Sequence, residues 1–500
     1  MKFTCNKRNI YVSLFLSITI IMVLVLKLDT QLLSSSQFSF SSTEDTQNQN
    51  NKYTEIIDTL TKNEKKLLEN EKKLSLFSDL VKQNEKKLSE NEVKMTLFAD
   101  AIGSDSVPIL TTYQKKVIET LEKDKKFTSD QTKFVRLRMG WAIAPILEQT
   151  PDNKELANQQ IHICWKSLYE TVMHQKSSVY KAGVMTIPYY QALKFTNMRI
   201  NDVIGDILGI IYPKYSINYE KPGVLGLFDS DEAQIAIKNM NSQGYHVLST
   251  KLKPETLKQM ENNLAKLKYS PHSKFNKAAR DGTVNWVQDQ FETLQKVPTS
   301  FDLMTDPTIL HVVQEYLGAA PMNTQVNTWW SVSDDDLNEE QAKKNKQSSQ
   351  VWHQDFTWIK FIKVFVYVND VYKDNGAHRY IPGSFKNIAP VLKFKANAYE
   401  VSNRIEDSII QTLYPGKETY MEGQAGTVVF EDTRGFHAGT PLKKGYRQLM
   451  QLEYAVSNFR YRNDAWFTSS LCQSMLSENT LIHQKLYPRV FERFEVKANC

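Results

Sequence analysis

The chain has 500 residues, of which 41% are hydrophobic and 24% charged, with a net charge of +6. This length exceeds that of one ordinary domain, so we expect two to four folded units joined by linkers. The composition is typical of a globular protein with a sizeable core. A charge so close to balance, without a basic stripe interleaved with aromatic residues, argues against a nucleic-acid partner.

The N-terminus carries an apolar run. Residues 10–26 contain no charge and predict a transmembrane helix at the short end of the spanning range. Lys2, Lys7 and Arg8 precede the run, so residues 1–9 are expected in the cytosol and the remainder across the membrane, as in a single-pass type II signal-anchor. A short span favours the endoplasmic reticulum or Golgi, with the rest of the chain in the lumen. The alternative is a cleaved signal peptide and a secreted protein, although no small-x-small cleavage pattern follows.

The cysteines are Cys5, Cys164, Cys472 and Cys500. They are too few and too scattered to form a disulfide framework. Cys5 is expected in the cytosol. In an oxidising lumen one pair can form among the other three, leaving one free thiol, and the sequence does not choose the pair.

A heptad repeat follows a polar linker at residues 27–52. Apolar residues recur every seven positions, at Leu67, Leu74, Val81, Leu88, Met95 and Ile102. Three positions after the first five of these stand Asn70, Phe77, Asn84, Asn91 and Phe98. The Asn residues add polar layers to the seam. Residues 53–104 are therefore predicted to form a coiled-coil stalk that joins copies of the chain into a homo-oligomer, with the Asn layers setting the register. The alternative is a solvated single helix or a flexible stem.

The remaining chain changes character near residue 230. Residues 105–229 repeat apolar side chains at helical spacing and predict a helical domain. His162 and His174 in this segment have no carboxylate at ligand spacing, so a packing or surface role is expected. In residues 230–460 helices precede strands, which predicts an α+β domain, and residues 461–500 form a C-terminal extension.

One group of residues has the side chains of a metal-binding site. His353 and Asp355 lie two residues apart in the β-rich segment 349–367, and on a strand both side chains would point to one face. They are two of the three ligands of the facial triad that binds non-haem Fe(II). His437, in the turn after a later strand, can complete the triad. Arg447 starts the next strand, where its guanidinium can hold a carboxylate in bidentate fashion, which indicates a dicarboxylate co-substrate.

Residues 232–456 resemble the phytanoyl-CoA dioxygenase-like branch of the 2-oxoglutarate-dependent oxygenases. The resemblance rests on the order of GYHVLSTKLKPETLKQM, EYLG, HQD and DNGAHRYIPGSFK, followed by His437 and Arg447. It implies a double-stranded β-helix (jelly-roll) core with flanking helices, Fe(II) on the three metal ligands, and 2-oxoglutarate on the arginine. O2 is the other co-substrate, and ascorbate is a further candidate cofactor. The chain departs from the family at Phe385, where His is common, and at Gly439, where some members have Ser.

The resemblance also implies a reaction. 2-Oxoglutarate is decarboxylated to succinate, and a substrate C–H bond is hydroxylated. Asp355 favours hydroxylation, because halogenating relatives carry a small residue in its place. The chain is thus predicted to be a membrane-anchored hydroxylase acting on a small-molecule, lipid or secreted-polypeptide substrate. The alternatives are a non-catalytic jelly-roll binding module on a coiled-coil stalk, and a halogenase or desaturase of the same fold.

Two further groups of polar residues lie near these motifs. Gln325, Asn327 and Trp329 alternate along one strand, so they share a face that is either part of the pocket or a hydrogen-bonded core. His378 occupies a turn position, which favours the surface over a ligand role.

Overall fold

The computed structural model describes residues 112–123, 127–173, 182–267, 270–271, 284–287, 296–332, 350–387, 404–457 and 469–498. Every described residue lies in one compact unit, Val93–Cys500. The transmembrane helix and the coiled coil predicted from the sequence lie outside the described residues. Among the described residues, no helix combines the length and apolarity that crossing a membrane requires.

Helices make up the first part of the described chain. They are α3 (Thr112–Lys123), α4 (Ser129–Gln149), α5 (Lys154–Met173), α6 (Ala182–Phe195) and α7 (Arg199–Ile211). Thr128 begins α4 through a reciprocal capping box with Gln131, which satisfies N–H groups that the first turn leaves unbonded. His162 on α5 contacts the ring of Tyr113, with centroids 5.2 Å apart. It therefore has the packing role expected from the sequence.

The second part of the chain is built on a large antiparallel sheet. Its strand order is β1 (Tyr245–Lys251), β8 (Thr427–Glu431), β5 (Phe361–Tyr367), β10 (Tyr446–Ala455), β4 (Met322–Val332), β3 (Val284–Val287) and β2 (Ser270–Pro271). Every neighbouring pair is antiparallel. The central strands come from distant parts of the chain, so the middle of the sheet joins segments that are far apart in sequence.

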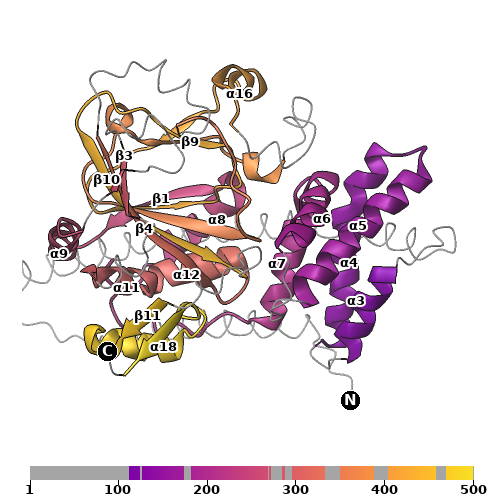
Figure 1. Ribbon diagram of the computed structural model, residues 1–500, viewed down its shortest axis with the longest axis horizontal. Coiled ribbons are helices and arrows are strands. Elements are labelled where there is room, and N and C mark those ends of the chain that lie inside the picture. The colour runs from indigo at the N-terminus through magenta and orange to yellow at the C-terminus, as the bar shows by residue number, and fades with distance from the viewer. Residues whose placement is uncertain are drawn as a thin grey trace, which may run out of the picture. The chain divides into compact units, whose positions relative to one another are not determined.

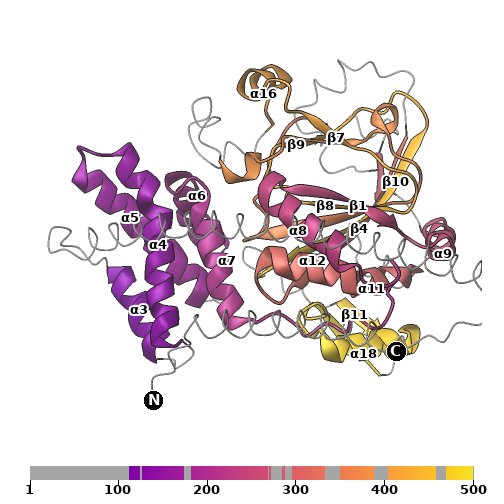
Figure 2. The ribbon, with the colours of Figure 1, turned by 180° about the vertical axis from the view of Figure 1, so that it is seen from behind.

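A smaller sheet and a set of helices lie on opposite sides of the large sheet (Figures 1 and 2). The small sheet has the order β7 (Thr419–Met421), β6 (His378–Tyr380) and β9 (His437–Gly439). The helices are α8 (Ser230–Gln243), α9 (Pro254–Leu264), α11 (Thr299–Met304) and α12 (Pro307–Leu317). Two antiparallel sheets with helices on one outer face form the jelly-roll core expected from the sequence.

The central strands present different side chains to their two faces. On β5, Ile362, Val364 and Val366 join the large apolar core, whereas Phe365 and Tyr367 pack with residues of the small sheet. Side chains alternate between the faces of a strand. Residues of the same parity as Phe365 therefore lie on the face toward the small sheet, and this face carries the polar residues described below.

Shorter elements complete the described chain. They are η2 (Lys373–Asn375), η3 (Ser384–Lys386), α16 (Asp407–Leu413), η4 (Gln473–Met475), α18 (Glu478–Leu486) and the parallel pair β11 (Ser469–Cys472) and β12 (Phe494–Lys497). Cys472 is disulfide-bonded, whereas Cys164 is free and buried. Burial raises the pKa of the Cys164 thiol far above its usual value, which keeps it protonated.

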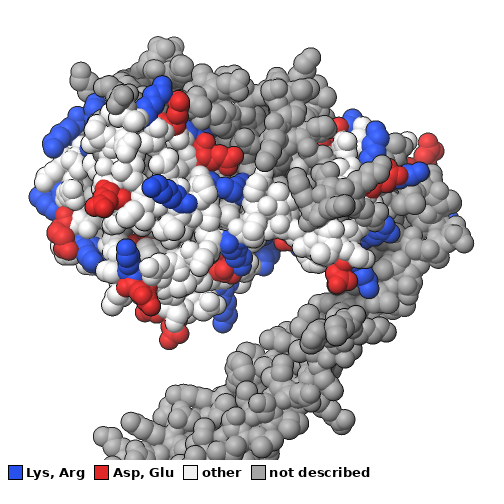
Figure 3. Space-filling model, turned by 90° about the horizontal axis from the view of Figure 1, so that it is seen from below, with Lys and Arg blue, Asp and Glu red and all other residues white. Residues whose placement is uncertain are grey.

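Charged side chains of both signs share the described surface. On the face shown in Figure 3, Lys and Arg lie among Asp and Glu, and no broad described area carries a single sign. This mixture matches the near-balanced net charge of +6.

A buried N-cap makes the stability of the fold depend on pH. Asp306 accepts from the N–H groups of Thr308, Ile309 and Leu225, and burial raises its pKa to about 6. Because the folded-state pKa lies above the unfolded value, the contribution to stability is full below the unfolded pKa and is lost as pH rises to about 6. Asp306→Asn keeps an oxygen acceptor and cannot ionise.

We expect the free energy of unfolding of the wild type, relative to Asp306→Asn, to fall by about 2.4 kcal/mol between pH 4 and pH 7. Urea denaturation at several pH values measures this difference. Asp229→Asn, which alters the exposed N-cap of α8, is the matched control and should follow the wild type. Parallel pH curves for the wild type and Asp306→Asn would contradict the expectation.

Candidate metal centre

Two backbone hydrogen bonds bring the predicted histidine ligands together. His353 N donates to His437 O and His437 N donates to His353 O, each at 3.0 Å. The two residues form an isolated antiparallel bridge, and their ring centroids lie 4.1 Å apart. The chain before β9 thus folds back on the segment that contains the HQD motif.

Asp355 completes the group. Its Oδ1 lies 3.9 Å from His353 Nε2, and its Oδ2 lies 3.4 Å from His437 Nε2. One donor atom from each of the three residues lies within 4.8 Å of the others. Two imidazole nitrogens and one carboxylate oxygen, converging in this way, are the donor set of the facial triad of non-haem iron. The three predicted ligands therefore meet at one point.

Backbone carbonyls orient both imidazole rings. His353 Nδ1 lies 2.8 Å from Val351 O, and His437 Nδ1 lies 2.9 Å from Gly435 O. A carbonyl only accepts, so each Nδ1 carries the proton and each Nε2 keeps its lone pair for a metal. Burial, together with the neighbouring His437, holds the pKa of His353 well below its usual value. The ring is therefore neutral, as a metal ligand must be.

The backbone around the HQD motif differs from the continuous strand expected over residues 349–367. β5 begins only at Phe361, after both ligands. Lys360 has a φ of 39°, a left-handed conformation that interrupts an extended strand. Asp355 N instead donates to Thr433 O at 2.8 Å. The ligands therefore lie on a separate segment that bonds to His437 and to the turn before β9, and not on β5.

A lysine that sequence reasoning missed lies against the carboxylate ligand. Lys363 Nζ is 2.7 Å from Asp355 Oδ2 and 3.8 Å from Glu453 Oε2. Glu431 and Glu453 are its cross-strand neighbours on β8 and β10. Burial disfavours ionisation of Asp355, but neighbouring groups, foremost the Lys363 ammonium, outweigh it and hold the pKa of this carboxyl well below its usual value. The carboxylate is therefore ionised and ready to bind a cation.

His378 lies beside the group, although its sequence position suggested a surface turn. It is the first residue of β6, where it pairs with Gly439, and its Nδ1 lies 2.7 Å from Glu431 Oε2. Its ring contacts that of His437, with centroids 5.4 Å apart. Gly376, with a φ of 97°, already ends the turn, so the chain is extended again at His378. With His437 and Glu431 it forms a second group of metal-ligating type.

Arg447 lies on β10 opposite Ser331 of β4. Its Nη1 donates to Gly376 O, and its Nη2 lies 3.5 Å from Ser331 Oγ. Its Nε is buried and has no hydrogen-bond partner among the described residues. Burial lowers the pKa of His378, and the positive charge of Arg447 adds to that lowering. The charge of Arg447 thus affects His378, which lies beside the predicted metal ligands. The Nε–H of Arg447 is an unsatisfied donor, and a carboxylate could accept its hydrogen bond.

The alternating residues on β4 occupy the face expected for a pocket or a polar core. Gln325 and Trp329 lie opposite Glu453 and Leu449 of β10. Trp329 packs against the apolar cluster between the two sheets. Asn327 lies between them, and its Oδ1 is buried without a partner in the described part of the chain. The shared face is confirmed, and the unpaired amide oxygen leaves one polar atom available on it.

The two departures from the family pattern occupy distinct places. Phe385 is buried, with the guanidinium carbon of Arg434 5.9 Å from its ring centroid. Gly439 pairs with His378 in the small sheet. The first therefore packs near the turn before β9, and the second lies next to His378.

We expect Lys363, the buried lysine beside Asp355, to contribute to the stability of the metal-free protein. Lys363→Met leaves Asp355, Glu453 and Glu431 without their shared cation, so we expect the metal-free protein to lose about 3–5 kcal/mol of unfolding free energy. A divalent cation restores positive charge beside these groups. Added Co²⁺ should therefore raise the melting temperature of this variant more than that of the wild type.

Lys363→Arg keeps the charge and serves as the control. Thermal melts with and without Co²⁺ provide the measurement. An equal Co²⁺-induced rise in melting temperature for Lys363→Met and the wild type would show that Lys363 does not take the place of the cation.

A jelly roll that holds two histidines and an aspartate with converging donor atoms has the fold of an Fe(II)/2-oxoglutarate oxygenase and a candidate site that fits its metal. Residues 240–445 match the family model described as Phytanoyl-CoA dioxygenase (PhyH). This part of the chain is a phytanoyl-CoA dioxygenase-like domain, as its motifs predicted. No curated protein matches the chain significantly.

Solved structures show a distant likeness. The "non-heme alpha ketoglutarate dependent carbocyclase SnoK from nogalamycin biosynthesis" is 18% identical and has a TM-score of 0.32, covering 47% of this chain and 86% of its own. HygX from Streptomyces hygroscopicus, with nickel and 2-oxoglutarate bound, is 16% identical and has a TM-score of 0.33. The match covers 49% of this chain and 91% of the HygX chain. EctD from S. alaskensis, with 2-oxoglutarate and 5-hydroxyectoine, is 16% identical and has a TM-score of 0.34. The match covers 49% of this chain and 86% of the EctD chain.

Proposed function

We propose that this chain is an Fe(II)- and 2-oxoglutarate-dependent dioxygenase that hydroxylates an unactivated C–H bond. The observation that carries the proposal is the convergence of His353, Asp355 and His437, with both imidazole Nε2 atoms directed to the same point as the carboxylate. The PhyH match over residues 240–445 supports the same class.

The donor set fits the metal and its co-substrate. Both histidines are held by carbonyls at Nδ1, which leaves Nε2 for coordination, and Asp355 is ionised. Bound iron supplies the activation of O2 that is coupled to the decarboxylation of 2-oxoglutarate. The unpartnered Nε of Arg447 suits a carboxylate of the co-substrate.

The protein's own residues set up the site. Before a metal ion binds, the ammonium group of Lys363 balances the negative charge of the Asp355 carboxylate. The hydrogen bond of 2.7 Å from Lys363 Nζ also fixes the direction of Asp355 Oδ2. The aromatic side chains of Phe365, Tyr367 and Trp329 line the face between the sheets and limit water there. The site is therefore charged at the metal ligands and apolar farther along the same face.

The setting of the enzyme is also part of the proposal. The uncharged run at residues 10–26 supports a type II anchor with the dioxygenase domain in the lumen of the endoplasmic reticulum or Golgi, or else a secreted protein. The heptads of residues 53–104 support a homo-oligomer. The substrate class is a small molecule, a lipid or a secreted polypeptide that passes through that compartment.

The test is succinate release by the purified full-length protein in detergent. With Fe(II), 2-oxoglutarate, ascorbate and O2, the wild type should release succinate slowly even without substrate, and His353→Ala should not. Metabolite and protein-hydroxylation profiles of cells that express each form then identify the product. Metal binding without any succinate release would instead support the non-catalytic binding module, and a halogenated or desaturated product would support the other alternative.

A further inference from the structure

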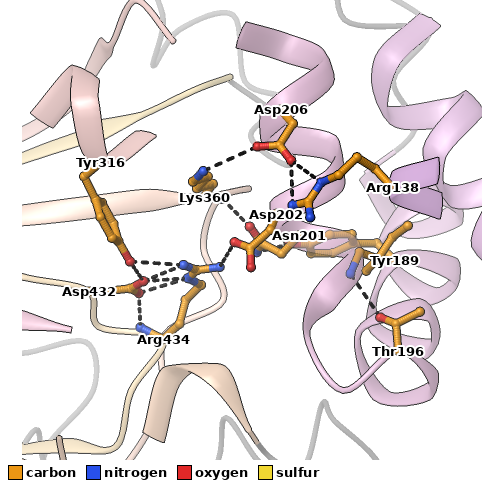
Figure 4. Close-up of polar contacts among 11 residues, drawn as sticks. Arg138, Tyr189, Thr196, Asn201, Asp202, Asp206, Tyr316, Lys360, Asp432 and Arg434 are labelled. Atoms are coloured by element: carbon orange, nitrogen blue, oxygen red, sulfur yellow. Dashed lines mark hydrogen bonds and ion pairs between the residues drawn. The ribbon is translucent and has the colours of Figure 1, made fainter. Parts of the chain in front are cut away.

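The helix α7 (Arg199–Ile211) lies outside the PhyH match and contacts both chain segments that carry the metal ligands (Figure 4). We propose that α7 is a positioning element of the metal centre, in which Asn201 and Asp202 hold the loop after Asp355 and the turn before His437. The inference assigns a role to the helical segment and rests on the metal site of the proposed function.

The first contact holds the loop that follows Asp355. The side-chain Oδ1 of Asn201 accepts from Lys360 N at 2.8 Å, and its Nδ2 donates to Tyr189 Oη at 2.8 Å. Lys360 is the residue with a φ of 39°, a conformation that needs support from its surroundings when the residue is not glycine. Asn201 is fully buried, so this hydrogen bond forms away from water. The amide thereby fixes the bend that separates Asp355 from β5.

Glycines allow α7 to approach this loop closely. A Cβ at Gly205 would lie 2.5 Å from Lys360 Cδ, and one at Gly209 would lie 2.3 Å from Gly318 O at the end of α12. Lys360 Nζ also lies 3.9 Å from Asp206 Oδ1. Side chains at these two glycines would push α7 away from the dioxygenase domain. The helix is thus shaped to contact the loop directly.

The second contact holds the turn before His437. Asp202 Oδ1 lies 3.6 Å from Arg434 Nη1, and Arg434 also binds both carboxylate oxygens of Asp432. Tyr316 donates to Asp432, which closes a buried network around the turn. Figure 4 shows Asp202 of α7 reaching this network from the helical side. The turn that leads into β9 is therefore held from both of its sides.

The two held segments are bonded to each other at the ligands. Asp355 N donates to Thr433 O at 2.8 Å, and Gln354 Nε2 donates to Arg434 O. Tyr190 of α6 adds a contact to Phe356, the residue after Asp355, with ring centroids 6.2 Å apart. A displacement of either segment would therefore change the distance between Asp355 and His437. Partners that orient ligands in this way typically contribute about 10- to 100-fold to metal affinity.

The test compares Co²⁺ binding and the visible spectrum of the Co²⁺-loaded full-length protein. Asn201→Leu removes the acceptor for Lys360 N and should weaken Co²⁺ binding by about 10- to 100-fold and shift the d–d bands. Thr196→Val is the matched control, because the bonds of Thr196 within the described part of the chain stay inside the α6–α7 turn. It should lower the melting temperature and leave the affinity and the bands unchanged.

Two further variants keep the test decisive if Asn201→Leu does not fold. Asp202→Lys changes a partly exposed residue and places like charges beside Arg434, so Co²⁺ binding should weaken by roughly threefold to tenfold. Lys360→Gly removes the need for support at a positive φ, so adding it to Asn201→Leu should restore part of the Co²⁺ affinity.

The outcomes separate the two proposals. Wild-type Co²⁺ affinity and bands in both folded Asn201→Leu and Asp202→Lys would overturn the role of α7. Failure of the wild type to bind Co²⁺ would overturn that role and the proposed function together. Tight Co²⁺ binding by the wild type without succinate release in the iron assay would overturn the proposed function alone.

Discussion

Replacing His437 with alanine should weaken the binding of Fe(II) or Co²⁺ by on the order of 10²–10³-fold and abolish succinate release. The loss follows because one of three ligands is removed and the metal affinity of a protein site is distributed over its ligands. The described histidine beside it, His378, is bonded to Glu431 and paired within the small sheet, so it would have to move with that sheet to replace His437. Anaerobic calorimetry with Co²⁺ measures the affinity, and succinate assays measure turnover.

His483→Ala provides the control for this prediction. His483 bonds to Thr305 near α11 and is not part of either metal-ligating group. Its substitution should leave both the affinity and the succinate rate close to the wild type. Full Co²⁺ affinity in His437→Ala would mean that the metal is held by a different set of residues.

Replacing Arg447 with methionine should raise the KM for 2-oxoglutarate by on the order of 100-fold. A charge-assisted hydrogen bond contributes about 1.5–3 kcal/mol, and a planar guanidinium forms two to one carboxylate. Arg447 is not a metal ligand, so the Co²⁺ affinity measured without co-substrate should change little. The separation of the two effects distinguishes the carboxylate role of Arg447 from a general loss of structure.

Arg447→Lys retains one positive charge but not the planar fork, so it should give an intermediate KM. Both variants are compared by succinate release over a range of 2-oxoglutarate concentrations, with melting temperature as the check on folding. An unchanged KM in Arg447→Met would place the co-substrate carboxylate elsewhere in the site.

Local signals explain why much of the fold was predictable. Gly318 ends α12 with a φ of 76°, Pro254 starts α9, and short runs rich in apolar residues mark β8 and β10, so these elements could be placed from neighbouring residues alone. The HQD motif, with His437 and Arg447 in family-like order, likewise pointed to the ligands. These are features of local sequence and of motif order.

The groups around the ligands could not be found in that way. In the sequence, Lys363 is one polar residue within an apolar strand. Its role depends on the register that places Glu431 and Glu453 beside it. His378 follows a turn motif, and only the pairing of β6 with β9 brings it against His437. Strand register between distant segments is not encoded in either segment alone.

The amino-acid sequence by itself determined the class of domain, and it predicted the three candidate metal ligands and the order of helices and strands. Only the tertiary structure decided how the ligands converge, because a left-handed bend at Lys360 and the turn before His437 replace the expected strand. It also brought α7 against both ligand-bearing segments. These contacts join residues far apart in the chain, and their geometry depends on packing that no local pattern specifies.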